Sequence, residues 1–218
     1  SNVEISLMAL TAQPTGEDAI LHITRPDNCE QRVTRTVIDR VKIEYVFEDG
    51  SAYKRNDGRY INALNNCDDP TLGYLSVNRS EFRGGGNGIW FYGYGGGAKM
   101  EFTNNVFWGG VALNGYGLSE DEPLNITLSF TGNRVTAVTR ATGNSPIVGI
   151  LFEWFSVKSS SLHFARNTFT QAESVNGIEE RGANLPPMLT VKHGGGYGQK
   201  PYPDDKYDVA LTIVGNTF

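Results

Sequence analysis

The residues best suited to chemistry are clustered carboxylates in two polar stretches. One stretch holds Asp204, Asp205 and Asp208, and residues 119–122 read Ser-Glu-Asp-Glu. Carboxylate oxygens grouped in this way are the ligands that Ca²⁺ prefers. The same composition is typical of solvated loop tips, so calcium binding is left open here and no metal site is predicted.

Tyrosines recur at one place relative to short apolar segments. Residues 92–95 read Tyr-Gly-Tyr-Gly, residues 114–117 read Asn-Gly-Tyr-Gly, and residues 196–198 read Gly-Tyr-Gly. If the apolar segments stack, these tyrosines lie on one side of the molecule and offer rings and hydroxyls to a sugar or a protein. The candidate ligand-binding residues are Tyr92, Tyr94, Tyr116 and Tyr197. The alternative is that the rings pack on one another, since Gly-Tyr-Gly is also ordinary loop chemistry.

Other kinds of catalytic or cofactor site are not indicated. Cys29 and Cys67 lack metal-ligand spacing and a nearby His at a recognisable catalytic spacing. The glycine-rich residues 84–88 lie between two expected strands, without the strand–helix context of a phosphate-binding loop. His22 and His163 lie within strand patterns, where a packed or surface histidine is the simpler reading. We therefore predict no catalytic residue and no cofactor.

The two cysteines also bear on the compartment. Both lie in polar, turn-like surroundings, which favours a Cys29–Cys67 disulfide in an oxidising compartment over two buried thiols. Glycosylation sequons begin at Asn78 and Asn125, and they are compatible with that compartment. We predict an extracellular or cell-surface location, a disulfide and glycosylation at these two asparagines.

Composition narrows the fold class and the partners. The 218 residues include 26 Gly, and 11% are aromatic, which favours strands and turns over helices. The net charge of −5 gives no electrostatic basis for nonspecific binding to nucleic acid. No apolar run approaches the roughly 18–20 residues that a membrane helix needs. The sequence predicts an all-β domain with no nucleic acid partner and no membrane insertion within this segment.

A repeat must position these residues. Five segments align without gaps on the pattern apolar-x-apolar-x-x-Asn-x-apolar, and their starts are 25 to 49 residues apart. They begin at Leu75, Met100, Leu128, Leu162 and Leu211. Their sixth positions are Ser80, Asn105, Asn133, Asn167 and Asn216. The motif is thus constant while the connections vary.

The pattern has a structural reading. Alternating apolar residues predict a short strand with one buried face. Asn tolerates left-handed backbone, so we expect the Asn to turn the chain sharply into a second short strand. Another apolar stretch precedes each copy, at residues 60–61, 88–91, 110–113, 149–152 and 188–191. Each unit then forms one coil of a right-handed parallel β-helix, a solenoid whose Asn side chains stack in a ladder.

The alternative is an antiparallel sandwich or propeller built from hairpins, but these connections exceed the usual hairpin loops of two to five residues. Residues 1–57 lack the motif and are expected to form strands that are divergent coils or a cap. Residues 58–218 are expected to form the coils, and the whole chain one continuous domain. Ten apolar residues should share one core: Leu75, Val77, Met100, Phe102, Leu128, Phe130, Leu162, Phe164, Leu211 and Ile213.

The coil pattern resembles right-handed β-helix proteins of the pectate-lyase-like superfold. Residues 102–105, 130–133 and 164–167 match the F-x-x-N repeat of chlamydial polymorphic outer-membrane adhesins. The chain also resembles the dispersed-gene-family surface proteins of trypanosomes, which carry irregular repeats of this style. These resemblances cover about residues 58–218, and they imply a surface-displayed, adhesive protein.

The same superfold contains polysaccharide lyases, glycosidases and tailspike-like depolymerases, so a carbohydrate-active enzyme is the alternative function. In polygalacturonases an aspartate pair precedes a His-Gly along successive coils, whereas here His193 precedes Asp204 and Asp205. Asp68 and Asp69 form the other acidic pair, and a basic substrate clamp is absent. We predict a non-catalytic structural or adhesive module that binds an extracellular glycan or protein.

The last motif copy carries an expectation of its own. Phe218 stands where Phe107 and Phe169 stand in earlier copies. A terminal coil exposes an unpaired strand edge and part of its core. We expect further coils of a longer β-helix, or another chain, to cover this end. The alternative is that residues 192–208 fold back over it.

Overall fold

The described part of the protein is entirely β-structure. The computed structural model describes residues 2–6, 8–12, 19–24, 35–45, 59–64, 74–83, 88–92, 98–108, 111–116, 124–138, 150–155, 157–172, 174–175, 178–179, 189–194 and 208–218. Within these ranges every regular element is a strand, which confirms the all-β class. No helix in this part has the length and apolar character needed to cross a bilayer.

Three parallel sheets contain nearly all of the described strands. Sheet A is formed by β1 (Asn2–Ser6), β4 (Arg35–Asp39), β7 (Tyr74–Asn78), β10 (Ala98–Thr103), β13 (Leu124–Thr131), β16 (Val157–Ala165) and β21 (Asp208–Val214). Sheet B is formed by β2 (Ala9–Ala12), β5 (Lys42–Tyr45), β8 (Glu81–Arg83), β11 (Val106–Trp108), β14 (Arg134–Val138) and β17 (Thr168–Ala172). Sheet C is formed by β3 (Ala19–Thr24), β6 (Arg59–Leu64), β9 (Gly88–Tyr92), β12 (Val111–Tyr116), β15 (Ile150–Phe155) and β20 (Leu189–Gly194).

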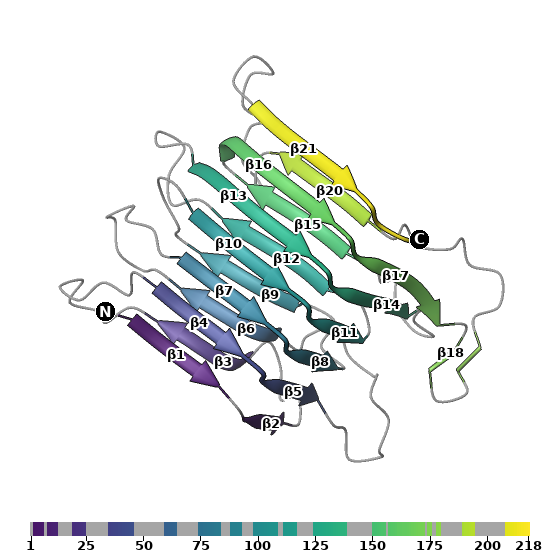
Figure 1. Cartoon of the computed structure of the whole chain (residues 1–218). Coiled ribbons are helices and arrows are strands. Elements are labelled where there is room, and N and C mark those ends of the chain that lie inside the picture. Colours follow the sequence, from purple (N-terminus) through teal and green to yellow (C-terminus); the bar gives the residue numbers. More distant parts are fainter. Residues whose placement is uncertain are drawn as a thin grey trace.

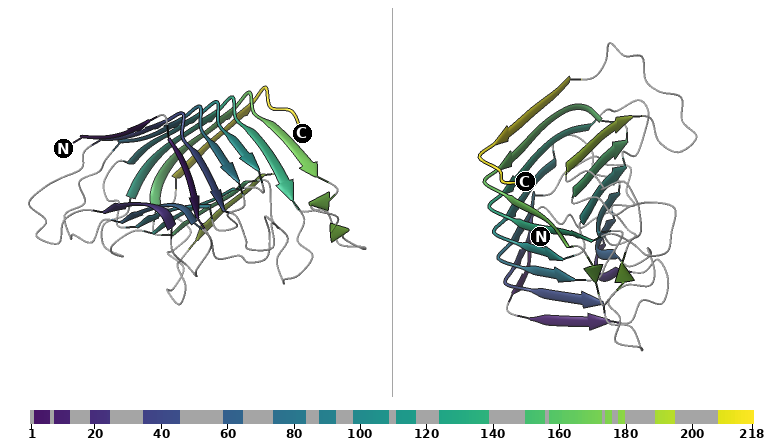
Figure 2. Two further views of the ribbon diagram at one scale, coloured as in Figure 1. Left: turned by 90° about the horizontal axis from the view of Figure 1, so that it is seen from below. Right: turned by 90° about the vertical axis from the view of Figure 1, so that its right-hand side faces the viewer.

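The chain visits the sheets in turn, A then B then C, so hydrogen-bonded neighbours are mostly three strands apart in the sequence. We call one strand from each sheet a rung, so that β1–β2–β3 is the first rung and β13–β14–β15 the fifth. Figure 1 shows the rungs stacked from β1 at one end to β21 at the other. In Figure 2, sheet C lies beneath the bent surface made by sheets A and B. A short antiparallel hairpin, β18 (Ser174–Val175) and β19 (Ile178–Glu179), interrupts the sixth rung.

The five motif copies pair in parallel and in the register of the ungapped alignment. Met100 pairs with Leu75 on one side and with Leu128 on the other, and Leu162 pairs with Leu128 and Leu211. The hairpin sandwich is therefore excluded for these strands. The five apolar stretches that precede the copies supply β6, β9, β12, β15 and β20 of sheet C.

Strands of the motif-poor N-terminal region join the same three sheets. β1 and β4 extend sheet A beyond β7, while β2 and β5 extend sheet B beyond β8. β3 pairs with β6 at the corresponding end of sheet C. These strands follow the same parallel order as the later rungs, although they lack the Asn of the repeat.

One core runs through the stack. Eight of the ten residues expected in it have at most 6% of their surface exposed: Leu75, Val77, Met100, Phe102, Leu128, Phe130, Leu162 and Phe164. Leu211 and Ile213 are 47% and 48% exposed, so for them the expectation is wrong. They occupy the same register as Leu162 and Phe164, but β21 has a neighbouring strand on one side only among the described residues. Their inner face is therefore only half covered.

Aromatic rings form columns inside this core. Phe82 stacks on Phe107 at 5.0 Å between ring centroids, and Phe130 lies 5.7 Å from Phe107 and 6.0 Å from Phe164. At the C-terminal end Phe169 stacks on Phe218 at 4.9 Å. Strand register makes equivalent residues of successive rungs neighbours, and this brings rings from distant parts of the sequence into contact.

The sharp turn between sheets A and B differs from the expected one. The described residues with positive φ precede the ladder position: Arg40, Arg79, Asn104, Gly132, Arg166 and Gly215. The sixth-position asparagines are not among them, so the expectation that they adopt left-handed backbone is wrong. Backbone hydrogen bonds hold the turn on both sides of Arg79, from Arg79 N–H to Thr103 O and from Glu81 N–H to Val41 O, each 2.9 Å. The Asn side chain has another role.

Candidate functional site

A column of asparagines joins successive rungs where sheet A turns into sheet B. Asn133 Oδ1 accepts hydrogen bonds from Asn105 N–H at 2.9 Å and from Asn105 Nδ2 at 3.0 Å. Asn133 Nδ2 in turn donates to Phe102 O at 2.9 Å and to Asn167 Oδ1 at 3.2 Å. Asn167 bonds to Asn216 in the same way. Asn105, Asn133 and Asn167 are at most 1% exposed, so the ladder lies inside the molecule and stabilises the stack.

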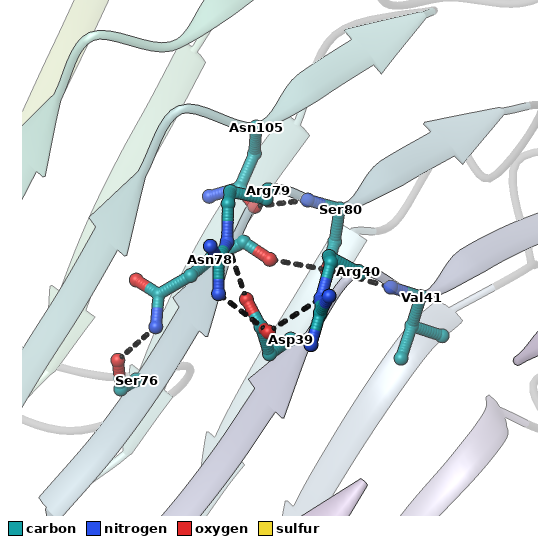
Figure 3. A network of polar contacts seen from close by, with 8 residues as sticks. All are labelled: Asp39, Arg40, Val41, Ser76, Asn78, Arg79, Ser80 and Asn105. Carbon is teal, nitrogen blue, oxygen red and sulfur yellow. Dashed lines mark hydrogen bonds and ion pairs between the residues drawn. The ribbon is translucent and has the colours of Figure 1, made fainter. Parts of the chain in front are cut away.

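The ladder changes chemistry toward the N-terminus (Figure 3). Asn105 Oδ1 accepts from Ser80 N–H at 2.9 Å, and Ser80 Oγ accepts from Val41 N–H at 3.1 Å. The ladder residue of this rung is Ser80, whose hydroxyl takes the place of the longer Asn carboxamide. The ladder residue of the rung before it is Val41, which has no polar side chain. The hydrogen bonds have one direction, because each ladder residue donates its N–H to the side chain of the next rung.

An ion-pair cluster flanks this end of the ladder (Figure 3). Arg79 donates to both oxygens of Asp39, at 2.8 Å to Oδ1 and 2.6 Å to Oδ2, and Arg40 Nε donates to Oδ2 at 2.9 Å. The hydrogen bonds from Arg79 are the main reason that the pKa of Asp39 lies below its usual value, and Arg40 adds to the effect. The carboxylate is satisfied within the cluster, so its arrangement is that of a structural ion pair.

A second cluster lies on the outer face of sheet A. Tyr74 Oη donates to Glu101, Lys99 Nζ lies 2.8 Å from the Glu101 carboxylate, and the cations of Arg35 and Lys99 each lie 5.5 Å from the Tyr74 ring centre. Lys99, followed by Tyr74, lowers the pKa of Glu101, while burial and Glu101 raise the pKa of Tyr74. Because two cations already contact this ring, Tyr74 is poorly placed to stack on a sugar.

Glu101, Ser129 and His163 occupy consecutive register positions on sheet A. These residue types occur in hydrolases, where a serine is activated by a hydrogen bond to a histidine. Here Ser129 Oγ lies 3.3 Å from Thr131 Oγ1, and in the described part of the chain no hydrogen bond joins Ser129 to His163. The row therefore lacks the geometry of a nucleophile and its base.

The candidate carboxylates lie mostly outside the described residues. This is true of Asp68, Asp69, Asp204, Asp205 and residues 119–122, so calcium binding there stays open. Asp208 begins β21, and His193 lies in β20. The described residues contain no group of three or more His, Cys, Asp or Glu that could hold a metal ion.

Two of the four candidate tyrosines fall on neighbouring strands. Tyr92 ends β9 and Tyr116 ends β12, and these two residues are register partners in sheet C. Leu64 of β6 and Phe155 of β15 continue the same row on either side. Tyr94 and Tyr197 lie outside the described residues. The row does not identify a ligand. It shows that Tyr92 and Tyr116 occupy equivalent places in successive rungs.

The features expected of a secreted protein are only partly visible. Cys29 and Cys67 lie outside the described residues, so their disulfide stays a prediction. Asn78 ends β7 half-buried, and its Nδ2 donates to Ser76 Oγ at 2.7 Å. Ser80 of the same sequon is 2% exposed, so modification here would have to precede folding. Asn125 lies in β13.

Sequence reasoning missed the outward-facing clusters around Tyr74 and Asp39. The signal that could have found them is the same ungapped alignment, read at its outer positions. Tyr74 and Lys99 both precede the first apolar residue of their copies, and Asp39 and Asn78 share one register position. Side chains at such positions are neighbours in a parallel sheet.

Comparisons with protein-family models, curated proteins and solved structures gave no significant match to this chain.

Proposed function

We propose that this chain forms a right-handed parallel β-helix that serves as a non-catalytic structural or adhesive module, secreted or displayed at a cell surface. The observation that supports this most is the parallel stack, in which strands visit three sheets in turn and an internal asparagine ladder joins the later rungs. Each rung buries its inner face only against its neighbours, as in repeat proteins. Such a stack is a stiff scaffold whose outer residues repeat at the strand spacing of roughly 4.8 Å.

The outer polar groups support a scaffold better than a catalyst. Asp39 is held by two arginines, and Glu101 is held by Lys99 and Tyr74. Catalytic carboxylates need a position and a pKa suited to a substrate, whereas these two are neutralised by partners within the protein. The alternative function, a carbohydrate-active enzyme, depends on Asp204, Asp205 and His193.

The ligand that we propose is an extracellular glycan or protein contacted by the tyrosine row of sheet C. Tyr92 and Tyr116 stand one rung apart in register, and Tyr94 and Tyr197 complete the set in sequence. Rings repeated at strand spacing suit contact with successive sugar rings or with a flat protein surface. The Cys29–Cys67 disulfide and glycosylation at Asn78 and Asn125 belong to this proposal, because they fit a protein exposed outside the cell.

The test is binding of the full chain to an array of extracellular glycans, followed by Tyr116→Ala. We expect the affinity for a bound glycan to fall by about two- to tenfold, since a stacking aromatic contributes on the order of 0.5–1.5 kcal/mol. Tyr74→Phe is the matched control and should leave binding unchanged, because that ring is occupied by Arg35 and Lys99. Equal binding by Tyr116→Ala and the unaltered chain would contradict the assigned surface.

A second assay separates the two functions. The full chain is incubated with pectin and polygalacturonate, with and without Ca²⁺, and reducing and unsaturated sugars are measured. We expect no release. Sugar release that is lost in Asp205→Asn would reject the non-catalytic proposal and favour the enzyme.

A further inference from the structure

Positive charge is concentrated on one side of this acidic chain. The whole sequence has 19 Lys and Arg and 24 Asp and Glu, which give a net charge of −5. The side chains described in sheets A and B and in the turns between them include eight Lys or Arg and five Asp or Glu, a net charge of +3 on the bent surface in Figure 2. The rest of the chain keeps 11 Lys and Arg and 19 Asp and Glu, a net charge of −8. The eight cations are Arg35, Arg40, Lys42, Arg79, Arg83, Lys99, Arg134 and Arg166, and the five anions are Glu4, Asp39, Glu44, Glu81 and Glu101.

The excess positive charge lies toward the fifth and sixth rungs. All five anions belong to the first four rungs, and four of them are already paired with cations. The pairs are Asp39 with Arg40 and Arg79, Glu44 with Lys42, Glu81 with Arg83, and Glu101 with Lys99. In sheets A and B, the described side chains of the fifth and sixth rungs include Arg134 and Arg166, both exposed, and no carboxylate. Within the described part of the chain neither arginine has an ion-pair partner.

A tryptophan lies on the outer face of sheet B, close to these arginines. Phe107 is fully buried in the core, so the next residue, Trp108, lies on the opposite face of the strand, where it is half-buried. Its register partners are Arg83 on one side and Thr136 on the other. Thr136 Oγ1 lies 3.1 Å from Thr170 Oγ1 of the next rung, and this pair is exposed. The indole ring therefore lies between a guanidinium group and a pair of hydroxyls.

The arginines near this ring are distributed along the axis of the stack. Arg134 begins β14, one rung after Trp108 and two residues before Thr136. Arg79 and Arg166 lie in the turns between sheets A and B, in the third and sixth rungs. They are three rung spacings apart, roughly 14 Å. We call six residues the basic face: Arg79, Arg83, Trp108, Arg134, Thr136 and Arg166.

The basic face fits a linear polymer with repeated anionic groups. Cations on several rungs can all be met by one chain that lies along the stack, and a single exposed indole ring suits contact with a sugar ring. A sulfate group offers three oxygens in different directions, so it can accept from arginines on two rungs, whereas one bidentate arginine satisfies a carboxylate. Single-stranded nucleic acid fits less well, because it stacks successive bases on several aromatic rings.

We propose that the basic face binds a sulfated polysaccharide that lies along the stack. One sugar ring stacks on Trp108 and bonds through a hydroxyl to Thr136, while sulfate groups pair with Arg134 and Arg166 and with the arginines of the third rung. This inference rests on the location outside the cell that is proposed above. It does not depend on the tyrosine row of sheet C, so either binding surface can fail without the other.

The test measures binding of the full chain to immobilised dextran sulfate by biolayer interferometry. Unsubstituted dextran and carboxymethyl dextran of matched length are the control ligands. We expect saturable binding of dextran sulfate that weakens as the NaCl concentration rises, because exposed ion pairs are screened. Unsubstituted dextran should not bind, and carboxymethyl dextran of equal substitution should bind at least about fivefold more weakly.

Two double variants locate the arginines. Arg134→Gln with Arg166→Gln should lower the affinity for dextran sulfate about five- to tenfold and reduce its dependence on NaCl, because two exposed ion pairs are lost. Arg35→Gln with Lys99→Gln is the matched control. It removes the same charge from sheet A, where both cations contact the Tyr74 ring, and should leave the affinity within about twofold.

Trp108→Thr tests the sugar contact. Threonine already occupies this register position in the next two rungs, as Thr136 and Thr170, so the sheet accommodates it. The affinity for dextran sulfate should fall about two- to tenfold. Its dependence on NaCl should stay unchanged, because the variant removes a ring and no charge. If Trp108→Thr does not fold, the two double variants still decide.

Four outcomes would overturn the proposal. The first is an equal affinity change in the two double variants, which would show general charge attraction without a site. The second is equal binding of carboxymethyl dextran. The third is tighter binding of oligothymidylate or of phosphatidylserine vesicles than of dextran sulfate at the same ionic strength. The fourth is a loss in Tyr116→Ala as large as in the Arg134 and Arg166 variant, which would assign dextran sulfate to the tyrosine row.

Discussion

At the residue scale, Asn105, Asn133 and Asn167 of the ladder connect three rungs each. Asn133 accepts from Asn105, donates to Asn167 and donates to Phe102 O, so one side chain satisfies backbone and amide groups in the rungs before and after it. A parallel sheet that bends sharply leaves backbone groups at the corner without sheet partners. The Asn carboxamide offers one acceptor oxygen and two donor protons. It can therefore bond to these backbone groups at a buried corner, where water does not replace the missing sheet partners.

We predict that Asn133→Ala destabilises the protein by about 3 kcal/mol or more. The change removes the acceptor of Asn105 N–H and Asn105 Nδ2 and the side-chain donor to Phe102 O in a buried site, and each such group costs roughly 1–3 kcal/mol. Urea unfolding monitored by circular dichroism measures the loss. Asn104→Gly is the control, because Asn104 is exposed and already has a φ of 56°, and it should change stability by less than about 1 kcal/mol.

We predict that Asp39 makes stability depend on acid pH. The two arginines lower the pKa of its carboxyl in the folded state relative to the ordinary value of 3.8, so its contribution is complete above about pH 4. The contribution is lost as pH falls through the lowered pKa, because the protonated carboxyl no longer pairs with Arg79. Thermal unfolding between pH 6 and pH 2.5 measures this slope.

Asp39→Asn should unfold at a lower temperature at pH 6 and should show a smaller decrease below pH 4. Glu101→Gln removes a separate carboxylate with a lowered pKa. Its effect on the pH dependence of the unfolding temperature should add to that of Asp39→Asn. A pH profile of Asp39→Asn that parallels the unaltered chain would show that the ion pair contributes nothing measurable.

At the element scale, each strand is short and gains its stability from the strands stacked on either side. β8 and β11 have only three residues, yet Phe82 and Phe107 at their centres are fully buried. Such strands cannot be stable alone, because one central side chain offsets little of the backbone entropy lost on ordering. The stacked aromatic residues are thus the main apolar contribution at this corner.

We predict that Phe164→Ala costs on the order of 3–5 kcal/mol, as a large side chain removed from a closed core. Phe218→Ala is the matched control. It removes the same ring from a position that is 64% exposed and in contact with Phe169, and it should cost less than half as much. Chemical denaturation of both variants gives the comparison. Equal losses would contradict this expectation, because they would mean that the ring of Phe218 contributes as much as the buried ring of Phe164.

The strands could be predicted from the sequence where the repeat carries their signal. Period-2 apolar residues in sheet A and the apolar stretches of sheet C identified ten strands, five in each sheet, because inward residues of every rung face the same core. The motif copy that forms β4 escaped notice, since Thr36 takes an apolar place and Val41 takes the place of Asn. The left-handed residue was assigned to the wrong position because Arg40, Arg79 and Arg166 have no intrinsic preference for it. Backbone hydrogen bonds from neighbouring rungs impose that geometry, and an isolated motif does not show them.

The site could be predicted less well, for reasons that are also physical. The alignment placed Tyr92 and Tyr116 in successive rungs, and they are register partners. The cluster around Tyr74 was not predicted, because its members occupy outer positions of the repeat and one of them, Arg35, lies on β4, where no motif copy was recognised. Exposure of Leu211 was missed because a sequence repeat states which residues point inward but not whether a neighbouring rung covers them.

At the scale of the whole molecule, contacts are made between neighbouring rungs, so the two ends of the stack are linked only through every rung between them. A cross-link can therefore stabilise one end with little direct effect on the other. Cys29 and Cys67 flank β4, β5 and β6 in the sequence, which are the strands of the second rung. That rung lies beyond the asparagine ladder, where Val41 offers no side-chain acceptor. A disulfide would reinforce the part of the stack that lacks the ladder.

We predict that Cys29 and Cys67 are bonded in protein isolated without reductant. A loop of this size contributes roughly 3–4 kcal/mol in the chain-entropy model, so reduction should lower the unfolding temperature. It should also speed hydrogen exchange in β4 and β5 more than in β13 and β16, because the later rungs keep their own ladder. Intact mass after thiol alkylation measures the bond directly. Two alkylated cysteines without reductant would remove the disulfide and the main sequence argument for a secreted location, while the parallel stack and its ladder would stand.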